Sequence, residues 1–193
     1  MLRFSWFDVD TVLLNQNIPW TAFLPPGDGF QDVHFLVSKD MNGLNIGIFF
    51  VRVNDWTIKM LSDVLALPSL RPDVEIGYNA EQDAMRWVLE QSRNREHVLY
   101  QPQHWYNAYE HADSSHPLHN GDLLVHFAGY GDKGPAMSKW LDRLEGENAD
   151  LLQPPMAHTT YPHQVREYWA RLRRAREVFR EVDEHRKEEW GHL

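Results

Sequence analysis

Two carboxylates interrupt an apolar segment near the start of the chain. The segment from Phe4 to Leu14 reads as a strand that is apolar except around Asp8 and Asp10. A carboxylate left unpaired in an apolar setting is costly, so two of them close together favour a cation between them. Carboxylate oxygens are ligands for hard divalent ions such as Mg²⁺ or Mn²⁺. The pair therefore predicts a metal site at a strand end, where open α/β sheets bind their ligands.

A histidine followed by glycines and a lysine forms a second candidate group. His126 lies near the end of the apolar segment Leu123–Phe127, and Gly129 and Lys133 follow it. An imidazole nitrogen can bind a metal, and glycines let backbone amides approach a pyrophosphate. Lys133 can supply positive charge to the same group. Together with the two aspartates, this histidine predicts a three-ligand site that suits octahedral Mn²⁺ completed by phosphate oxygens.

A polar turn around residue 80 has two interpretations. In the first, Asn79 caps a helix and Gln82 reaches back to it as a capping box, with acidic residues at the positive end of the helix dipole. In the second, the turn lies in a cleft, where Glu81 and Gln82 hold sugar hydroxyls or stabilise positive charge on a sugar ring. The polar residues exceed what a cap requires, so both interpretations stay open.

Three histidines in one polar loop raise a separate possibility of a metal site. His111, His116 and His119 lie close together in the sequence. Solvent-facing loop histidines are the simpler interpretation, and the metal site is the less favoured one.

The hydrophobic pattern predicts an α/β fold that positions these groups. Besides the first strand, we expect strands at Val33–Ser38, Ile46–Val53, Val98–Gln101 and Leu123–Phe127. The run Ile46–Val53 is continuously apolar, which is typical of a strand buried on both faces. We expect helices from a cap at Asp55 to Pro68, after Asn79, at Met137–Leu144 and at Pro162–Glu189. In the first of these helices, the apolar residues expected to face inward are Trp56, Met60, Leu61, Val64 and Leu65.

The C-terminal region reads as one long amphipathic helix. A break at Gln153–Pro155 separates a domain over residues 1–150 from an extension over residues 151–193. Apolar residues recur at helical spacing among Arg and Glu, from Val165 through Trp169 and Leu172 to Val178, Phe179 and Val182. We expect this helix to pack on its own domain, with a solvated charged face, in preference to a partner or membrane role.

Composition excludes several classes of function. The chain has 193 residues, of which 42% are hydrophobic and 24% charged, which fits one globular domain with a sizeable core. A net charge of -9 argues against nucleic acid as a partner, because phosphate-backbone binders carry a basic face. Cysteine is absent, so disulfides and thiolate metal sites are excluded. No apolar run is long enough for a membrane span, and no signal-peptide pattern precedes the first strand, so we expect a soluble chain.

Five motifs in register resemble the galactosyl/mannosyl transferase family, which holds fungal alpha-galactosyltransferases, Golgi alpha-mannosyltransferase subunits and plant xyloglucan xylosyltransferases. They are Trp6–Asn15, Leu44–Arg52, Glu81–Ala84, Gln101–Asn107 and His126–Gly129. The resemblance covers about residues 3 to 145. It implies a GT-A fold and retaining transfer of a hexose, galactose or mannose, from a nucleotide sugar to a glycan acceptor. It also implies Mn²⁺ as cofactor, with Mg²⁺ as the substitute.

The resemblance also implies roles for individual residues. Asp10 and His126 hold the metal, with Asp8 near the metal or the ribose, and Gly129 lies against the pyrophosphate. Gln82 lies close to the anomeric carbon and Glu81 orients sugars. Asn45 and Gly47 line the cleft on the donor or acceptor side, and the expected sugar-stacking residues are Trp105 and Tyr106. Relatives carry a lysine where this chain has Gly131, so Lys133 is the candidate substitute.

The resemblance further implies a donor of the UDP-galactose or GDP-mannose class and, for a full-length form, the luminal side of the Golgi membrane. The nucleotide-binding half and the membrane anchor of the family precede its Asp-x-Asp, so we expect this chain to lack both. One alternative is therefore a non-catalytic transferase-like subunit or a truncated remnant, with a partner subunit. A second alternative is a haloacid-dehalogenase-like phosphatase, in which Asp8 is the nucleophile and Asp10 the acid/base.

Overall fold

Two β-sheets form the centre of the molecule. The computed structural model describes residues 2–110, 117–147 and 149–190. The larger sheet has the strand order β1–β4–β3–β5, and the smaller sheet pairs β2 with β6. Their bounds are β1 Arg3–Phe7, β2 Thr11–Leu13, β3 Phe35–Asp40, β4 Gly43–Arg52, β5 Val98–Gln101 and β6 Leu124–His126. Strand β4 is antiparallel to β1 and β3, β5 is parallel to β3, and β2 is antiparallel to β6.

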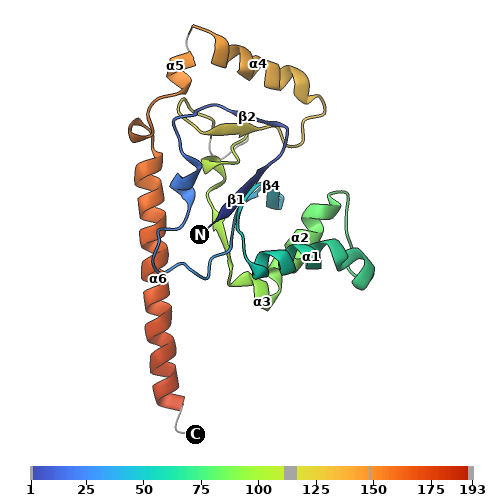
Figure 1. The fold of residues 1–193 in the computed structure, drawn as a ribbon, viewed down its shortest axis with the longest axis vertical. Coiled ribbons are helices and arrows are strands. Elements are labelled where there is room, and N and C mark those ends of the chain that lie inside the picture. The colour runs from blue at the N-terminus through green and yellow to red at the C-terminus, as the bar shows by residue number, and fades with distance from the viewer. Residues whose placement is uncertain (1, 111–116, 148, 191–193) are drawn as a thin grey trace.

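The helices surround these sheets on different sides. Helix α6 runs along one side of the molecule, α1, α2 and α3 lie on the opposite side, and α4 and α5 lie at one end (Figure 1). Their bounds are α1 Asp55–Leu70, α2 Ala80–Glu90, α3 Ser92–Arg95, α4 Lys133–Glu145, α5 Ala149–Leu152 and α6 Tyr161–Trp190. Within the described residues, no helix combines the length and the apolarity that crossing a membrane requires. The predicted α/β class is confirmed.

The core lies on both faces of the larger sheet. Ile48 and Phe50 of β4 pack with Trp105 and with Trp169 of α6, whereas Phe49 packs on the other face with α1 and α2. Alternating side chains of a strand point to opposite faces, so a continuous apolar run fills both. The prediction that this strand is buried on both faces is confirmed. A third cluster joins the smaller sheet to α4 and α5.

The single strand predicted over Phe4–Leu14 is wrong. Strand β1 ends at Phe7 and β2 begins at Thr11, and the two belong to different sheets. The residues between them carry the two aspartates, whose carboxylates are costly to bury against an apolar sheet face. Strand β1 is also an edge strand with half-exposed side chains, not a buried one. The aspartates therefore lie on a crossing between two sheets.

Helix α1 differs from its prediction at both ends. Asn54, not Asp55, is the N-cap, and its Oδ1 accepts a hydrogen bond from the Thr57 amide at 3.0 Å. The helix continues through Pro68 to Leu70, because a proline in the last turn removes only one helical hydrogen bond. The inward face is shifted as well: Leu61 and Leu65 are exposed, and Thr57 and Leu67 are buried in their place.

Helix α4 is longer than predicted, whereas α6 matches its predicted bounds to within one residue at each end. Helix α4 begins at Lys133, four residues before the predicted start, because the Asp132 side chain caps it by accepting from the Gly134 amide at 3.2 Å. Helix α6 is as long as predicted. Its N-terminal half packs on the core, with the Trp169 ring 4.8 Å from the Phe30 ring. Val178, Phe179 and Val182 are exposed, so the predicted packing of the apolar face is right only for the first half.

Candidate functional site

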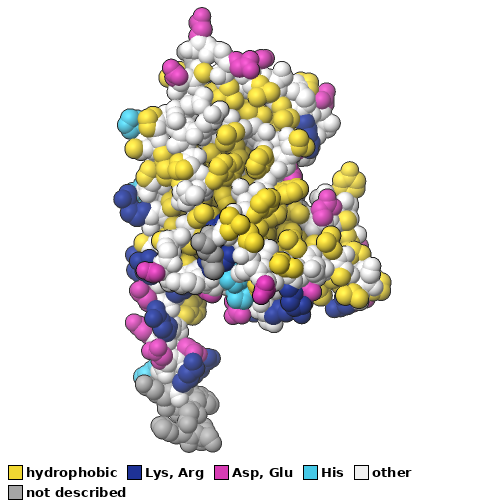
Figure 2. All heavy atoms as spheres, viewed as in Figure 1, with side chains coloured by type: hydrophobic (Ala, Val, Ile, Leu, Met, Phe, Trp, Pro, Cys, Tyr) yellow, Lys and Arg dark blue, Asp and Glu magenta, His cyan; other side chains and the backbone are white. Residues whose placement is uncertain are grey.

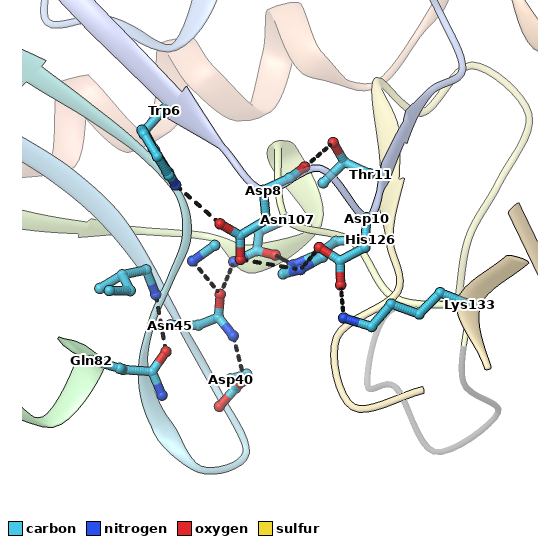
Figure 3. Close-up of polar contacts among 12 residues, drawn as sticks. Trp6, Asp8, Asp10, Thr11, Asp40, Asn45, Gln82, Asn107, His126 and Lys133 are labelled. Carbon is cyan, nitrogen blue, oxygen red and sulfur yellow. Dashed lines mark hydrogen bonds and ion pairs between the residues drawn. The ribbon is translucent and has the colours of Figure 1, made fainter. Parts of the chain in front are cut away.

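Asp8, Asp10 and His126 come together at the junction of the two sheets (Figure 3). Asp8 follows the end of β1, Asp10 precedes β2, and His126 is the last residue of β6. The register of the small sheet pairs His126 with the residue after Asp10, and this brings the two side chains together. One ligand atom from each of the three residues lies within 4.8 Å of the others. His126 Nε2 is 3.4 Å from Asp10 Oδ1 and 3.9 Å from Asp8 Oδ2.

Burial and charge set the protonation of this cluster. The His126 and Asp10 side chains are buried, whereas the Asp8 side chain is 44% exposed, so the cluster opens on one side. Burial lowers the pKa of His126, and this outweighs the two carboxylates, which raise it. Burial alone would raise the pKa of Asp10, but the hydrogen bond from Lys133 and the nearby positive charge lower it. Near neutral pH, the cluster therefore holds an ionised Asp10 beside a neutral imidazole.

This arrangement fits a divalent cation. His126 Nδ1 lies 2.7 Å from Asn107 Oδ1, which can only accept, so Nδ1 carries the proton of the neutral ring. The lone pair of Nε2 then faces the carboxylates of Asp8 and Asp10. A lone pair and carboxylate oxygens repel each other unless a cation lies between them. Two oxygen ligands and one imidazole nitrogen suit Mn²⁺ or Mg²⁺.

Lys133 supplies a positive charge at the edge of the cluster. As the first residue of α4, it directs Nζ to Asp10 Oδ2, with which it forms an ion pair (Figure 3). The lysine side chain is 44% exposed. The ammonium group therefore shares Asp10 with any cation that binds there, and it can reach a ligand from the open side.

An irregularity in β4 shapes the opposite wall of the site. The register between β3 and β4 shifts after Val37, so that Ser38 pairs with Asn45. The Gly47 amide donates to Asn45 Oδ1 at 3.0 Å, and the Asp8 amide donates to the Gly47 carbonyl at 2.8 Å. A Cβ atom at Gly47 would overlap His126 Cε1 and come within 3.0 Å of His126 Nδ1. Glycine at this position gives the imidazole its space.

The polar turn before α2 reaches this irregularity. The Ile46 amide donates to Gln82 Oε1 at 3.2 Å. Asn79 precedes the helix without a side-chain cap hydrogen bond, so the predicted capping box is wrong. Because Oε1 of Gln82 is occupied, its amide nitrogen is the group that remains to bind a ligand. Glu81 and Gln82 line a cavity, as the second interpretation of this turn requires, and the contacts with a sugar stay a prediction.

One cavity of about 940 Å³ joins these groups. Its lining includes nine residues singled out in the sequence: Asp8, Asp10, Asn45, Gly47, Glu81, Gln82, His126, Gly129 and Lys133. Gly129 has a φ of +76° and open space where a Cβ atom would lie, so its backbone is accessible. Among the described residues, the lining contains four carboxylates, from Asp8, Asp10, Asp40 and Glu81, against one ammonium group, that of Lys133. This excess of negative charge favours a cation.

Trp105 and Tyr106 do not belong to this cavity. Trp105 is 1% exposed and Tyr106 is 0% exposed, and both pack in the core beside Phe23. The Trp105 indole donates to Gln164 Oε1 at 2.9 Å. Neither ring has a free face, so the prediction that they stack on a sugar is wrong.

Three residues of the site were missed in the sequence. Trp6 lines the cavity and donates through Nε1 to Asp8 Oδ1 at 3.0 Å. Its position two residues before Asp8, on the same side of the predicted strand, was the available signal. Asp40 also lines the cavity, and Asn107 contacts His126 behind it. Nothing in the local sequence around these two residues indicated their contacts.

The histidine loop offers no second metal site within the described residues. His111 and His116 lie outside them. The side chain of His119 is 71% exposed, and its Nδ1 lies 3.9 Å from Asp122 Oδ2.

Comparison with known proteins identifies the family. Residues 25–134 match the galactosyl transferase GMA12/MNN10 family. The chain belongs to this family. The matched region includes the cavity residues from Asn45 to Lys133, whereas Asp8 and Asp10 precede it. Membership of this family favours the transferase interpretation over the phosphatase alternative.

Two curated members of the family come from Schizosaccharomyces pombe. An alpha-1,2-galactosyltransferase is 34% identical over 116 residues, which are 58% of this chain and 30% of that protein. A probable alpha-1,2-galactosyltransferase is 33% identical over 156 residues, which cover 64% of this chain and 46% of that protein. The chain thus spans less than half the length of either relative.

A solved structure shares the fold. It is a glycosyltransferase involved in glycosylation of the major capsid of PBCV-1, with a TM-score of 0.51 and 19% identity. The likeness covers 72% of this chain and 66% of that chain. The α/β arrangement described above is therefore a glycosyltransferase fold.

Proposed function

We propose that this chain is a retaining glycosyltransferase of GT-A type that moves a hexose from a nucleotide sugar to a glycan acceptor with the help of Mn²⁺. The names of the curated relatives support galactose as the hexose and therefore a donor of the UDP-galactose class. A GDP-mannose donor is the alternative. As part of the same proposal, the acceptor is a glycan of the Golgi lumen.

The observation that carries this proposal is the convergence of separate parts of the chain on one cavity. Asp8, Asp10 and His126 form a candidate cation site at its wall, and Gly129 and Lys133 line the same cavity. A nucleotide sugar presents a diphosphate that needs positive charge and a sugar that needs polar contacts. Glu81 and Gln82 supply polar groups elsewhere in the same cavity.

The chemistry follows from the placement of these groups. The two aspartates and His126 would hold the cation, which supplies positive charge to offset the charge on the departing diphosphate. Lys133 adds an ammonium group for the same oxygens, and the open backbone at Gly129 lets them approach closely. The bond between the anomeric carbon and the diphosphate oxygen breaks, and the acceptor oxygen bonds to the same face. The acceptor proton leaves with the diphosphate.

Glu81 and Gln82 act on the sugar in this proposal. With Oε1 held by the Ile46 amide, the Gln82 side chain keeps a fixed direction and offers its amide N–H groups to the sugar. Glu81, one residue earlier in the first turn of α2, can accept hydrogen bonds from sugar hydroxyls. Both groups orient the sugar relative to the cation site.

A transfer assay tests the proposal. The protein is incubated with Mn²⁺, with UDP-galactose or GDP-mannose, and with a panel of mannose and galactose acceptors, and products are detected by mass spectrometry. We expect galactosylated product whose anomeric proton coupling in NMR is that of an α-linkage. Asp10→Asn should abolish it, whereas Asp73→Asn, at an exposed aspartate paired with Arg71, should not.

Absence of both transfer and donor hydrolysis in a folded sample with Mn²⁺ would contradict a catalytic role for this chain alone. It would favour the non-catalytic subunit. Addition of candidate partner subunits to the same assay would then show whether activity needs a second chain.

A further inference from the structure

A continuous chain of hydrogen bonds leads from Asp40 to the candidate metal ligand His126. Asn45 Nδ2 donates to Asp40 Oδ2 at 3.0 Å. Asn107 Nδ2 donates to Asn45 Oδ1 at 2.9 Å, and His126 Nδ1 donates to Asn107 Oδ1 at 2.7 Å. The two contacts of Asn107 are buried and the contact with Asp40 is part-buried. Together they join β3, β4 and β6 through the segment after β5 (Figure 3). The contact between Asn107 and His126 was noted above, but what holds Asn107 itself in this orientation was not.

The orientation of the side-chain amides in this series of hydrogen bonds is fixed by a backbone amide, which cannot turn over. The Gly47 backbone amide can only donate, and it lies 3.0 Å from Asn45 Oδ1. The atom of Asn45 that faces it must therefore be the oxygen. The same oxygen also faces Asn107, so the nearer end of the Asn107 amide must be the nitrogen.

The other end of Asn45 gives the same answer independently. Its second amide atom faces Asp40 Oδ2, a carboxylate oxygen that accepts hydrogen bonds. That atom is therefore the nitrogen, which also donates to the Tyr109 hydroxyl at 2.8 Å. Tyr109 in turn donates to Asp40 Oδ2 at 2.8 Å. Two anchors, a backbone amide and a carboxylate, thus agree on one orientation.

The side-chain amide of Asn107 cannot exchange the positions of its oxygen and its nitrogen. Its Nδ2 also lies 2.9 Å from Ser38 Oγ, a hydroxyl that can donate or accept, so the contact with Asn45 decides the orientation. Reversal of the amide would place the Asn107 oxygen against Asn45 Oδ1, and two acceptors would then face each other. Asn107 is fully buried, and no solvent is at hand to replace the lost hydrogen bond. Its oxygen must consequently face His126, and His126 must carry its proton on Nδ1.

We propose that Asn107 is a positioning residue that holds His126 in the Nδ1–H tautomer, so that Nε2 presents a lone pair to the cation shared with Asp8 and Asp10. The opposite tautomer would place a proton on Nε2, 3.4 Å from Asp10 Oδ1. A hydrogen bond from that proton to the Asp10 carboxylate would remove the repulsion between Nε2 and the carboxylate, so that no cation would be needed between them. Asn107 prevents this competing state. The inference rests on the proposed cation site, and it does not depend on sugar transfer.

The tautomer can be read directly in the metal-free protein. Long-range proton–nitrogen NMR of the imidazole rings distinguishes a protonated from a bare ring nitrogen, and the His126 signals are assigned by their loss in His126→Gln. For the wild-type protein near neutral pH, we expect a protonated Nδ1 and a bare Nε2. A wild-type ring with the proton on Nε2 would overturn the proposal without any variant of Asn107.

Variants then test whether Asn107 is the cause. In Asn107→Ala the acceptor is lost, and we expect the proton to move to Nε2. Asn107→Asp keeps an oxygen acceptor and should keep the proton on Nδ1. The control is Asn94→Ala, which removes another buried asparagine, one that donates to the Val88 carbonyl away from the cavity. This control should leave the His126 signals unchanged.

Mn²⁺ affinity provides the second readout. Loss of an outer-shell partner of a metal-bound histidine typically weakens binding about 10–100-fold, and we expect a loss in this range for Asn107→Ala in calorimetry with Mn²⁺ alone. A folded Asn107→Ala protein that keeps both the wild-type tautomer and the wild-type affinity would overturn the proposal. Because both measurements omit the nucleotide sugar, they remain decisive even if the transfer assay fails.

Discussion

At the scale of single residues, Gly47 is where backbone geometry controls the candidate metal site. Its missing side chain leaves the space that the His126 ring fills. In Gly47→Ala the added methyl group would push the imidazole away from Asp8 and Asp10. We expect Mn²⁺ affinity, measured by calorimetry, to fall about tenfold or more, at least the loss that is typical when only an outer-shell partner of a metal ligand is removed. Gly27→Ala is the matched control, because nothing lies within 4 Å of a Cβ atom there. Equal affinities for both variants would refute this role of Gly47.

Lys133 should affect the cation and the diphosphate in opposite directions. Its ammonium group pairs with Asp10, so it competes with a cation for the same carboxylate. We expect Lys133→Met to bind Mn²⁺ alone more tightly, but to bind a nucleoside diphosphate less tightly at saturating Mn²⁺. Separate calorimetric titrations measure the two affinities. Lys59→Met, at an exposed lysine paired with Asp63, is the control. Changes of the same sign in both titrations would contradict this assignment.

At the scale of elements, one arginine fastens the middle of α6 to the body. Arg176 donates to both Asp32 carboxylate oxygens, each at 2.8 Å, and to the Gly29 carbonyl at 2.7 Å. Its guanidinium also lies 4.8 Å from the centre of the Phe30 ring. We expect Arg176→Ala to speed hydrogen exchange in residues 28–32 and 172–187, with little change in metal binding. Arg173→Ala, at an exposed position of the same helix, should not do so. Unchanged exchange in Arg176→Ala would show that the apolar contacts of α6 suffice.

The sequence predicted elements well wherever one pattern decided them. The apolar residues at helical spacing correctly predicted the length of α6, and the continuous apolar run correctly predicted that β4 is buried on both faces. The first strand was not, because an apolar pattern cannot show that the chain changes sheets at Asp8. Trp105 and Tyr106 were misplaced for a related reason: the sequence shows that a ring is aromatic but not which face of the fold it lies on. The candidate metal ligands could be predicted together, because two unpaired carboxylates need a cation and an imidazole can share it. The contact between Asn107 and His126 depends on packing and could not.

At the scale of the whole molecule, an apolar region lies over β1. Hydrophobic side chains gather at the centre of the face shown in Figure 2. The exposed hydrophobic residues of the molecule include Phe4, Trp6 and Phe7 of β1 and the preceding Leu2. Among the described residues, β1 is an edge strand, so one side of its backbone is unpaired. An apolar edge strand promotes association between chains, and a lysine in it opposes association.

We therefore expect the protein to self-associate as its concentration rises, and Phe4→Lys to reduce this. Sedimentation velocity over a concentration series measures the effect. Val178→Lys changes an exposed apolar residue of α6, away from the sheet, and should leave association unchanged. If the two variants behave alike, general surface polarity and not the strand edge governs association.

The central claim concerns the whole cavity, in which a cation and a nucleoside diphosphate bind together. Its most direct test is calorimetric titration of UDP and of GDP into the protein, with and without Mn²⁺, beside Asp10→Asn. We predict binding of one of the two nucleotides that requires Mn²⁺ and is lost in Asp10→Asn, with UDP favoured by the galactosyltransferase relatives. Binding that is equal with and without Mn²⁺, or no binding of either nucleotide by the folded protein, would contradict the claim.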